Sequence, residues 1–192
     1  QVDGKELIIG PKKIKENSRN GNSYNLQPTK FKVITNSREI KELNVVSSGD
    51  FIIACPINIG KLEINMAGSG NILLEKKVEG NKLEINLASS GSVVASNIDL
   101  AGIECSLAGS GYIQIAGKAD RAEYNLAASG NIKAYECVTG KTECNIAGSG
   151  NIQTHTRNQL EANIVGSGNV YYKGNPTTSK SIIGSGKLKS AN

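Results

Sequence analysis

The sequence predicts an all-β protein folded as a single-stranded parallel β-helix, and three observations lead to this prediction. A serine–glycine pair recurs eight times in the 192 residues, at intervals of 18 to 21 residues. Apolar and polar residues alternate within each repeat, which is the period of a half-buried strand. No segment shows the periodicity of an amphipathic helix. A repeat of this length cannot bury its own apolar face, so we expect about eight turns stacked about 4.8 Å apart. Right-handed coiling is favoured because the repeats lack a hexapeptide pattern.

The serine–glycine pair is expected to form the bend in each turn. Glycine and small residues suit a tight corner, and an apolar residue resumes the strand two positions after each glycine. The repeated serine is therefore predicted to be a structural residue and not a nucleophile. The glycines are Gly49, Gly70, Gly91, Gly111, Gly130, Gly150, Gly168 and Gly186, each preceded by serine. The predicted corner ladder includes Ser69, Gly70, Ser110, Gly111, Ser149 and Gly150.

The strand before each bend carries two polar columns. Glutamate stands seven residues before the glycine in seven repeats, and asparagine or serine stands five residues before it. Stacked glutamates repel by roughly 1 kcal/mol per neighbour, so we expect basic residues two positions earlier to pair with them. A divalent cation on the glutamates is the alternative. With the asparagines placed at the bend, we expect them to hydrogen-bond to one another along the axis. The basic residues are Lys61, Lys82, Arg121 and Lys141.

The chain is expected to divide into an N-terminal leader and cap, residues 1–40, and a β-helix repeat domain, residues 41–192. One outward column is apolar in the first turns only, and such a stripe should be covered. The predicted cover is a β cap formed around Phe31, Val33 and Ile34, which hides the open sheet edge; the alternative is a subunit interface. The apolar part of the column is Ile52, Leu73 and Val94.

The formal net charge of +5 is a property of the N-terminal segment. Residues 1–40 hold eight Lys and Arg against four Asp and Glu, whereas the remainder is nearly neutral with 14 against 13. The basic residues lack the aromatic neighbours of a stacking surface, so nucleic acid is not a predicted partner. No apolar run reaches the roughly 20 residues of a membrane-spanning segment. Because the chain begins with Gln1, we expect an exported protein whose signal has been removed, located in the periplasm, on the outer-membrane surface or outside the cell.

The four cysteines are tested against the repeat register. Cys105 and Cys144 share a column but lie two turns apart, about 9.6 Å, which is too far for a disulfide. Cys55 is likewise four turns from Cys137, whereas a disulfide between Cys137 and Cys144 stays open. We expect free thiols that behave as small buried apolar residues. The cysteine spacing fits no zinc motif and His155 is the single histidine, so no metal site is predicted.

The sequence lacks the residue patterns of common enzymes. A serine nucleophile needs a nearby base, and glycoside hydrolysis needs two carboxylates at a set separation, whereas the acids here are spread along a ladder. The glycine motif precedes no helix and is not a phosphate loop. We therefore predict no catalytic residue and no cofactor. Tyr171 and Tyr172 form the candidate interaction patch, for a sugar or a protein, and filling of the sheet edge is the alternative.

The motif Ala-Gly-Ser-Gly-Asn-Ile, at residues 67–72 and 147–152 and varied at 127–132, resembles the signature of the head GIN domain family of putative auto-transporter adhesins. The resemblance covers about residues 31–192. It implies an exported β-helical protein, typical of Bacteroides-like bacteria, with an adhesin-like or surface role. The family supplies no site residues that transfer to this chain. The first turn, with Gly49-Asp50-Phe51, and the last, with Lys187-Leu188, depart from the motif.

The functional hypothesis is a non-enzymatic exported protein of adhesin-like or cell-envelope role, which presents a rigid β-helix surface. Its expected partners are a glycan or a cell-surface protein, and a homo-oligomer is possible. The alternative function is a carbohydrate-active or carbohydrate-binding β-helix that acts on extracellular polysaccharide.

Overall fold

The structure is a computed structural model that describes residues 2–3, 6–7, 40–46 and 48–191. The chain divides into two units, Gln1–Thr35 and Asn36–Asn192. In the first unit two short strands, β1 (Val2–Asp3) and β2 (Glu6–Leu7), pair antiparallel. The residues expected to cap the first turn, Phe31, Val33 and Ile34, lie outside the described residues. The cap, and with it the domain boundary at residue 40, stays a prediction.

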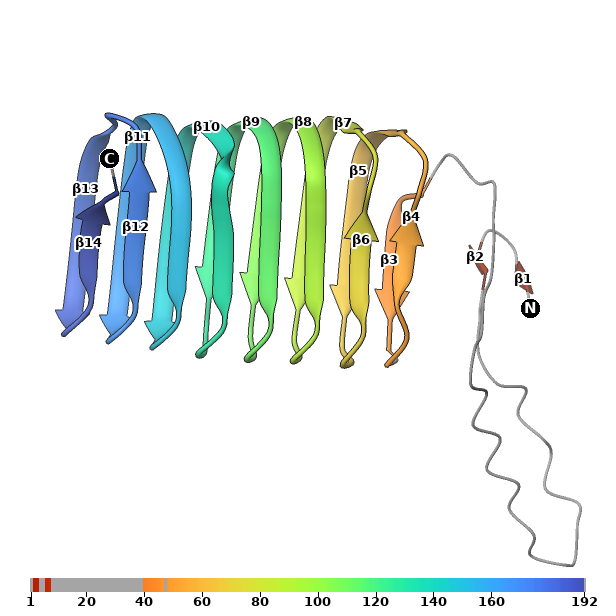
Figure 1. Cartoon of the computed structure of the whole chain (residues 1–192), viewed down its shortest axis with the longest axis horizontal. Coiled ribbons are helices and arrows are strands. Elements are labelled where there is room, and N and C mark those ends of the chain that lie inside the picture. The colour runs from red at the N-terminus through yellow and green to blue at the C-terminus, as the bar shows by residue number, and fades with distance from the viewer. Residues whose placement is uncertain (1, 4–5, 8–39, 47, 192) are drawn as a thin grey trace, which may run out of the picture. The chain divides into compact units, whose positions relative to one another are not determined.

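The second unit is a β-solenoid of about seven turns built from parallel strands, which confirms the predicted fold class (Figure 1). The prediction of about eight turns counted the serine–glycine bends. Eight bends enclose seven complete turns, which explains the difference. The strands are β3 (Glu42–Val45), β4 (Phe51–Ile53), β5 (Ile57–Met66), β6 (Asn71–Leu74), β7 (Val78–Leu87), β8 (Ser92–Leu107), β9 (Tyr112–Leu126), β10 (Asn131–Gly148), β11 (Asn151–Gly166), β12 (Asn169–Lys173), β13 (Thr177–Gly184) and β14 (Lys187–Ser190). No helix in the described part of the chain is long and apolar enough to cross a membrane.

Consecutive turns pair in the register that the repeats predict. The sheet runs in the order β14-β12-β11-β10-β9-β8-β7-β5-β3, and β8 to β11 each extend through most of a turn. Glu84 pairs with Glu104 and Asn86 with Ser106, so residues of one column lie directly above one another. The asparagine side chains hydrogen-bond along the axis as expected, although they lie on the strands and not at the bends. The Nδ2 atom of Asn86, for example, donates to Oδ1 of Asn65 at 2.9 Å.

The core consists of inward columns of aliphatic side chains from every turn, because alternate residues of each strand point inward. Two neighbouring turns depart from this pattern. Thr139, Thr142, Thr154 and Thr156 of β10 and β11 are buried and hydrogen-bonded to one another. The hydroxyls of Thr142 and Thr156 lie 2.7 Å apart. Each hydroxyl has a partner, so the network satisfies the polar atoms that it buries.

The bends are points of close contact between turns. A Cβ atom on Gly111 would lie 2.0 Å from the carbonyl oxygen of Gly91 in the preceding turn. That same oxygen accepts a hydrogen bond from the backbone N–H of Tyr112 at 3.3 Å. Only a residue without a side chain fits this position, whereas the neighbouring serines are exposed. A second column of small residues lies two positions before the bend glycines. In the earlier turns it also contains residues other than glycine, but from Gly148 onward it is always glycine. The backbone φ of 149° at Gly148 favours glycine there.

All four cysteines are free. Cys105, Cys137 and Cys144 are buried in the core, which confirms the expected small apolar role. No disulfide joins Cys137 and Cys144, the pair that the sequence left open. Cys55 is exposed, so the expectation of burial was wrong for this residue. It follows β4 and precedes Pro56, outside the alternating pattern that places side chains in the core.

Candidate binding faces

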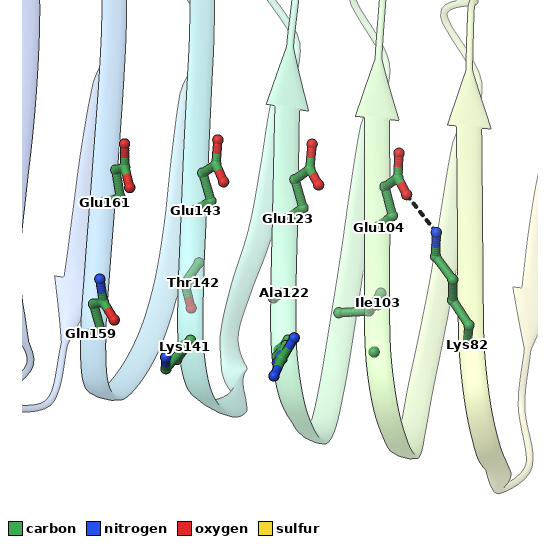
Figure 2. A pocket seen from close by; sticks show the side chains of 12 residues that line it. Lys82, Ile103, Glu104, Ala122, Glu123, Lys141, Thr142, Glu143, Gln159 and Glu161 are labelled. Carbon is green, nitrogen blue, oxygen red and sulfur yellow. Dashed lines mark hydrogen bonds and ion pairs between the residues drawn. The ribbon is translucent and has the colours of Figure 1, made fainter.

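The glutamate column lines a shallow depression of about 450 Å³ on the outside of the middle turns. Figure 2 shows Glu104, Glu123, Glu143 and Glu161 in one row along the axis, with Lys141 and Gln159 in a second row beside them. Both rows follow from the alternation of the strands, because residues two positions apart point to the same side. We call this surface the glutamate face.

Lysines bridge the glutamates at the N-terminal end of the glutamate face. The Nζ atom of Lys61 lies 3.1 Å from Glu63 and 3.0 Å from Glu84, and Lys82 lies 3.5 Å from Glu84 and 2.7 Å from Glu104. The hydrogen bond from Lys61 holds the pKa of Glu84 below its ordinary value, and the same bond raises the pKa of Lys61. The predicted alternation of charges is thus confirmed for these two lysines.

The predicted pairing is wrong at Arg121 and Lys141, which make no ion pair with residues of the described chain. The column of basic residues is interrupted between Lys82 and Arg121 because Gly102 occupies the intervening turn. Within the described ranges, no group of three or more His, Cys, Asp or Glu side chains is arranged to hold a metal ion. The glutamate face therefore combines a carboxylate row with two cations, Arg121 and Lys141, that have no ion-pair partner among the described residues.

A second outward face gathers lysines over tyrosine rings. The Nζ atom of Lys133 lies 4.6 Å from the ring centroid of Tyr112, which belongs to the preceding turn. The distance from Lys173 to Tyr135 is 4.8 Å, and that from Lys189 to Tyr171 is 5.6 Å. These separations are those of cation–π interactions. We call the surface formed by these six residues the lysine–tyrosine face.

A register shift in β10 gives Tyr135 its position on the lysine–tyrosine face. Regular pairing with β11 is interrupted between Ala134 and Val138, so Tyr135 and Glu136 lie in the irregular stretch. From there Tyr135 contacts Lys173, which lies two turns further along, and the Glu136 carboxylate is 3.8 Å from the same ammonium. Partial burial raises the pKa of Tyr135, and the neighbouring Tyr171 adds to the shift. The phenol therefore stays neutral at physiological pH.

The two tyrosines of the predicted interaction patch have different surroundings. Tyr171 points outward, beneath Lys189, and belongs to the lysine–tyrosine face. Tyr172 is partly buried and packs against the core. The predicted corner ladder lies at the bends, with Ser69, Ser110 and Ser149 exposed and Gly70, Gly111 and Gly150 buried.

Sequence reasoning missed five of the six residues of the lysine–tyrosine face. Lys133 and Lys189 share the outward column of Tyr171, and Tyr112 lies two positions before that column. The recurrence of lysine and tyrosine in the later turns could thus have identified these residues from the sequence. Tyr135 and Lys173 gave no such signal, because the register shift in β10 brings them together.

The fold and the two faces define a β-solenoid that presents its outward side chains to a partner. The chain belongs to the family described as "putative auto-transporter adhesin, head GIN domain", whose model matches residues 1–94 and 71–176. The overlapping matches reflect the repeats. No curated protein matches the sequence.

Solved structures from Parabacteroides species share the fold. A structure from Parabacteroides distasonis described as a "putative lipid binding protein" is 52% identical, with a TM-score of 0.93, and the match covers 100% of this chain and 77% of that chain. A "putative adhesin" from Parabacteroides merdae is 33% identical, with a TM-score of 0.74, over 79% of this chain and 64% of that chain. Another from P. distasonis is 29% identical, with a TM-score of 0.77 and the same coverage. This chain therefore spans less than two thirds of the two adhesin structures.

Proposed function

We propose that the protein is a non-enzymatic binding module, exported and acting at the cell envelope or surface, which holds its partner on the lysine–tyrosine face. The observation that carries this proposal is the set of three lysines, each placed over a tyrosine ring on one outward surface. Membership of a family described as adhesins supports it. An exported adhesin needs a surface that stays folded outside the cell, and a solenoid whose successive turns are hydrogen-bonded to one another offers one.

The rigidity of the scaffold favours binding. Backbone hydrogen bonds connect every turn to the next, so the side chains of the face are carried by strands that need little further ordering when a partner arrives. Tyrosine adds contact area at a low entropic cost because it has few rotatable bonds. Lysine adds charge and directed N–H donors. A glycan or a cell-surface protein meets these requirements.

Lipid binding is the second candidate function. Val165 and Ile183 are paired in neighbouring turns, and their side chains are 54% and 68% exposed. The structure that is 52% identical to this chain is described as a lipid binding protein. Apolar side chains that project from a sheet are suited to contact with acyl chains.

A carbohydrate-active function, by contrast, requires an acid and a nucleophile or base on the glutamate face to cleave a glycosidic bond.

The experiment measures binding and turnover together. Labelled protein is applied to a glycan array and to bacterial and epithelial cells, and reducing-sugar release is followed on the array glycans that bind. We expect saturable binding without turnover, and at least a ten-fold weaker signal for the triple variant K133Q/K173Q/K189Q. The matched control K76Q/R121Q/K141Q removes the same number of charges from other surfaces and should bind like the wild type.

Three results contradict the proposal. Release of reducing sugars that requires Glu123 or Glu143 identifies an enzyme instead. Equal binding by the wild type and K133Q/K173Q/K189Q places the partner elsewhere on the molecule. Binding to phosphatidylcholine vesicles that is lost in V165S/I183S, with no binding to glycans or cells, favours the lipid candidate. Light scattering of the same preparations reports whether the chain assembles with itself.

A further inference from the structure

We propose that the lysine–tyrosine face binds a linear acidic polysaccharide, with its chain lying along the solenoid axis. This inference rests on the proposed function and names the class of partner for the same face. It follows from the length of the face, from the amide groups between its charged residues, from the charge of the last turns, and from the position of the ammonium groups over the rings.

The length of the face excludes a single sugar as the complete ligand. Lys133, Gln153, Tyr171 and Lys189 occupy one outward column in four successive turns. At about 4.8 Å per turn, Lys133 and Lys189 are about 14 Å apart along the axis. One monosaccharide is too short to contact both lysines, whereas an extended polymer reaches them with successive units. A periodic surface of this kind is suited to a periodic ligand.

Amide side chains supply the groups that recognise hydroxyls. Asn131, Asn151 and Asn169 form an outward column beside the lysines, and each amide donates to the preceding one, at 3.3 Å from Asn151 and 3.1 Å from Asn169. Gln153 lies between Lys133 and Tyr171 in register. An amide carries two donor hydrogens and an acceptor oxygen, so the ladder retains hydrogen-bonding capacity toward a ligand. Sugar hydroxyls, which both donate and accept, complement such amides.

The charge of the last turns selects an acidic polymer over a neutral one. After Glu161 the sequence contains four lysines and no aspartate or glutamate. Glu136 is 3.8 Å from Lys173, but Lys133 and Lys189 make no ion pair within the described chain. Their charge is therefore available to sugar carboxylates or sulfates. The excess of positive charge on the last turns also raises the local concentration of an oppositely charged polymer. The lysines are Lys173, Lys180, Lys187 and Lys189.

The ammonium groups over the rings argue against a membrane as the partner of this face. Aromatic residues that anchor a protein in a bilayer place their rings at the headgroup level and below. Here the Lys133 ammonium lies over the Tyr112 ring, 4.6 Å from its centroid, so inserting the ring would also desolvate a charge. A polysaccharide leaves the ammonium groups hydrated at the surface and contacts them from outside.

The test compares two forms of one polymer. Polygalacturonate and its fully methyl-esterified form share a backbone and differ in their carboxylates. We expect the full chain to bind polygalacturonate at least ten-fold more tightly than the ester, with an affinity that falls as salt is added. The variant K133Q/K173Q/K189Q should lose at least ten-fold in affinity, while K76Q/R121Q/K141Q, which has the same net charge, should change less than two-fold.

The tyrosines give a second readout, because their substitution leaves the net charge unchanged. Replacing Tyr112 and Tyr171 by Leu should weaken binding to both polymers, whereas replacement by Phe should retain most of it. Equal losses in the two charge-matched triple variants would show non-specific attraction and overturn the inference. So would binding to phosphatidylglycerol vesicles in place of the polymer. If binding to cells depends on Lys133, Lys173 and Lys189 but neither uronate nor sulfated polymers bind, the proposed function stands and only the ligand class is wrong.

Discussion

The side-chain amide of Asn145 donates a hydrogen bond to the amide oxygen of Asn125 in the preceding turn, at a distance of 2.9 Å. Its second hydrogen is directed at Oε1 of Glu143 in its own turn, 3.0 Å away. Asn163 in turn donates to Asn145 at 3.0 Å. From Asn125 to Asn163 the asparagine and glutamate columns therefore form one connected ladder, in which amides link neighbouring turns and each orients a carboxylate of its own turn.

The first prediction follows from this ladder. Asn145→Ala removes two donated hydrogen bonds and one acceptor, so we expect a loss of about 1–2 kcal/mol in the free energy of unfolding. Chemical denaturation followed by circular dichroism measures it. Asn158→Ala, at an exposed asparagine, is the matched control and should change stability by less than about 0.5 kcal/mol. Equal stability of the two variants would mean that the ladder contributes no net stability.

A second prediction concerns the bends. Gly111→Ala would place its Cβ 2.0 Å from a backbone oxygen of the preceding turn, and backbone cannot move aside as a flexible side chain can. We expect a loss of about 3 kcal/mol or a protein that does not fold. Gly60→Ala is the control, because nothing lies within 4 Å of its added Cβ. It should change stability by less than about 1 kcal/mol. A well-folded Gly111→Ala protein with wild-type stability would contradict the close packing at the bends.

The fold was predictable because the repeat specifies the register. A serine–glycine bend at a nearly fixed interval aligns every column, and alternation decides which side chains point inward. The structure departs from the predicted register or burial where two neighbouring turns differ in length, or where a turn has no neighbouring turn to cover it. The register shift in β10 brings Tyr135 into contact with Lys173, and the periodicity of the sequence does not predict that contact. Lys180 continues the inward column of Ala162 but is exposed, since no further turn in the described chain covers it.

Charge pairing was only partly predictable for the same reason. The sequence shows which columns are acidic and which are basic, but the pairs that form depend on each turn and its neighbours. Lys61 and Lys82 stand in consecutive turns and each bridges two glutamates. Arg121 follows a turn in which Gly102 takes the basic position, and it makes no ion pair in the described chain. The sequence did not predict the threonine network of β10 and β11, because in the sequence each inward threonine is only a single polar residue within an apolar column.

A third prediction is the pH dependence of the pair formed by Lys61 and Glu84. The pKa of Glu84 lies below its ordinary value of 4.5, because Lys61 donates a hydrogen bond to its carboxylate. The stabilisation from this carboxylate is present above pH 4.5 and is lost as the pH falls through the lowered pKa. The pKa of Lys61 lies above 10.5, mainly because of Glu84, so its contribution is lost as the pH rises through that raised value.

The variant Lys61→Met tests this directly. Carbon-detected NMR titration should show the pKa of Glu84 moving up toward its ordinary value, and the stability difference between the variant and the wild type should shrink at acid pH. Lys76→Met, at an exposed lysine, should leave the Glu84 titration unchanged. An unshifted Glu84 in Lys61→Met would show that the carboxylate is held by other groups.

The last prediction concerns the thiols. Burial raises the pKa of Cys137 to about 12, and it also raises the pKa values of Cys105 and Cys144, so these three thiols are both protonated and inaccessible at neutral pH. Cys55 alone is exposed. A thiol-specific disulfide reagent at pH 8 should therefore modify one cysteine per native chain and four in denaturant, and Cys55→Ser should leave none reactive in the native state. The slow reaction of the remaining three then reports opening of the middle turns, because each thiol reacts only when its turn separates from the stack. Fast modification of Cys144 in the native protein would contradict a closed core at the centre of the solenoid.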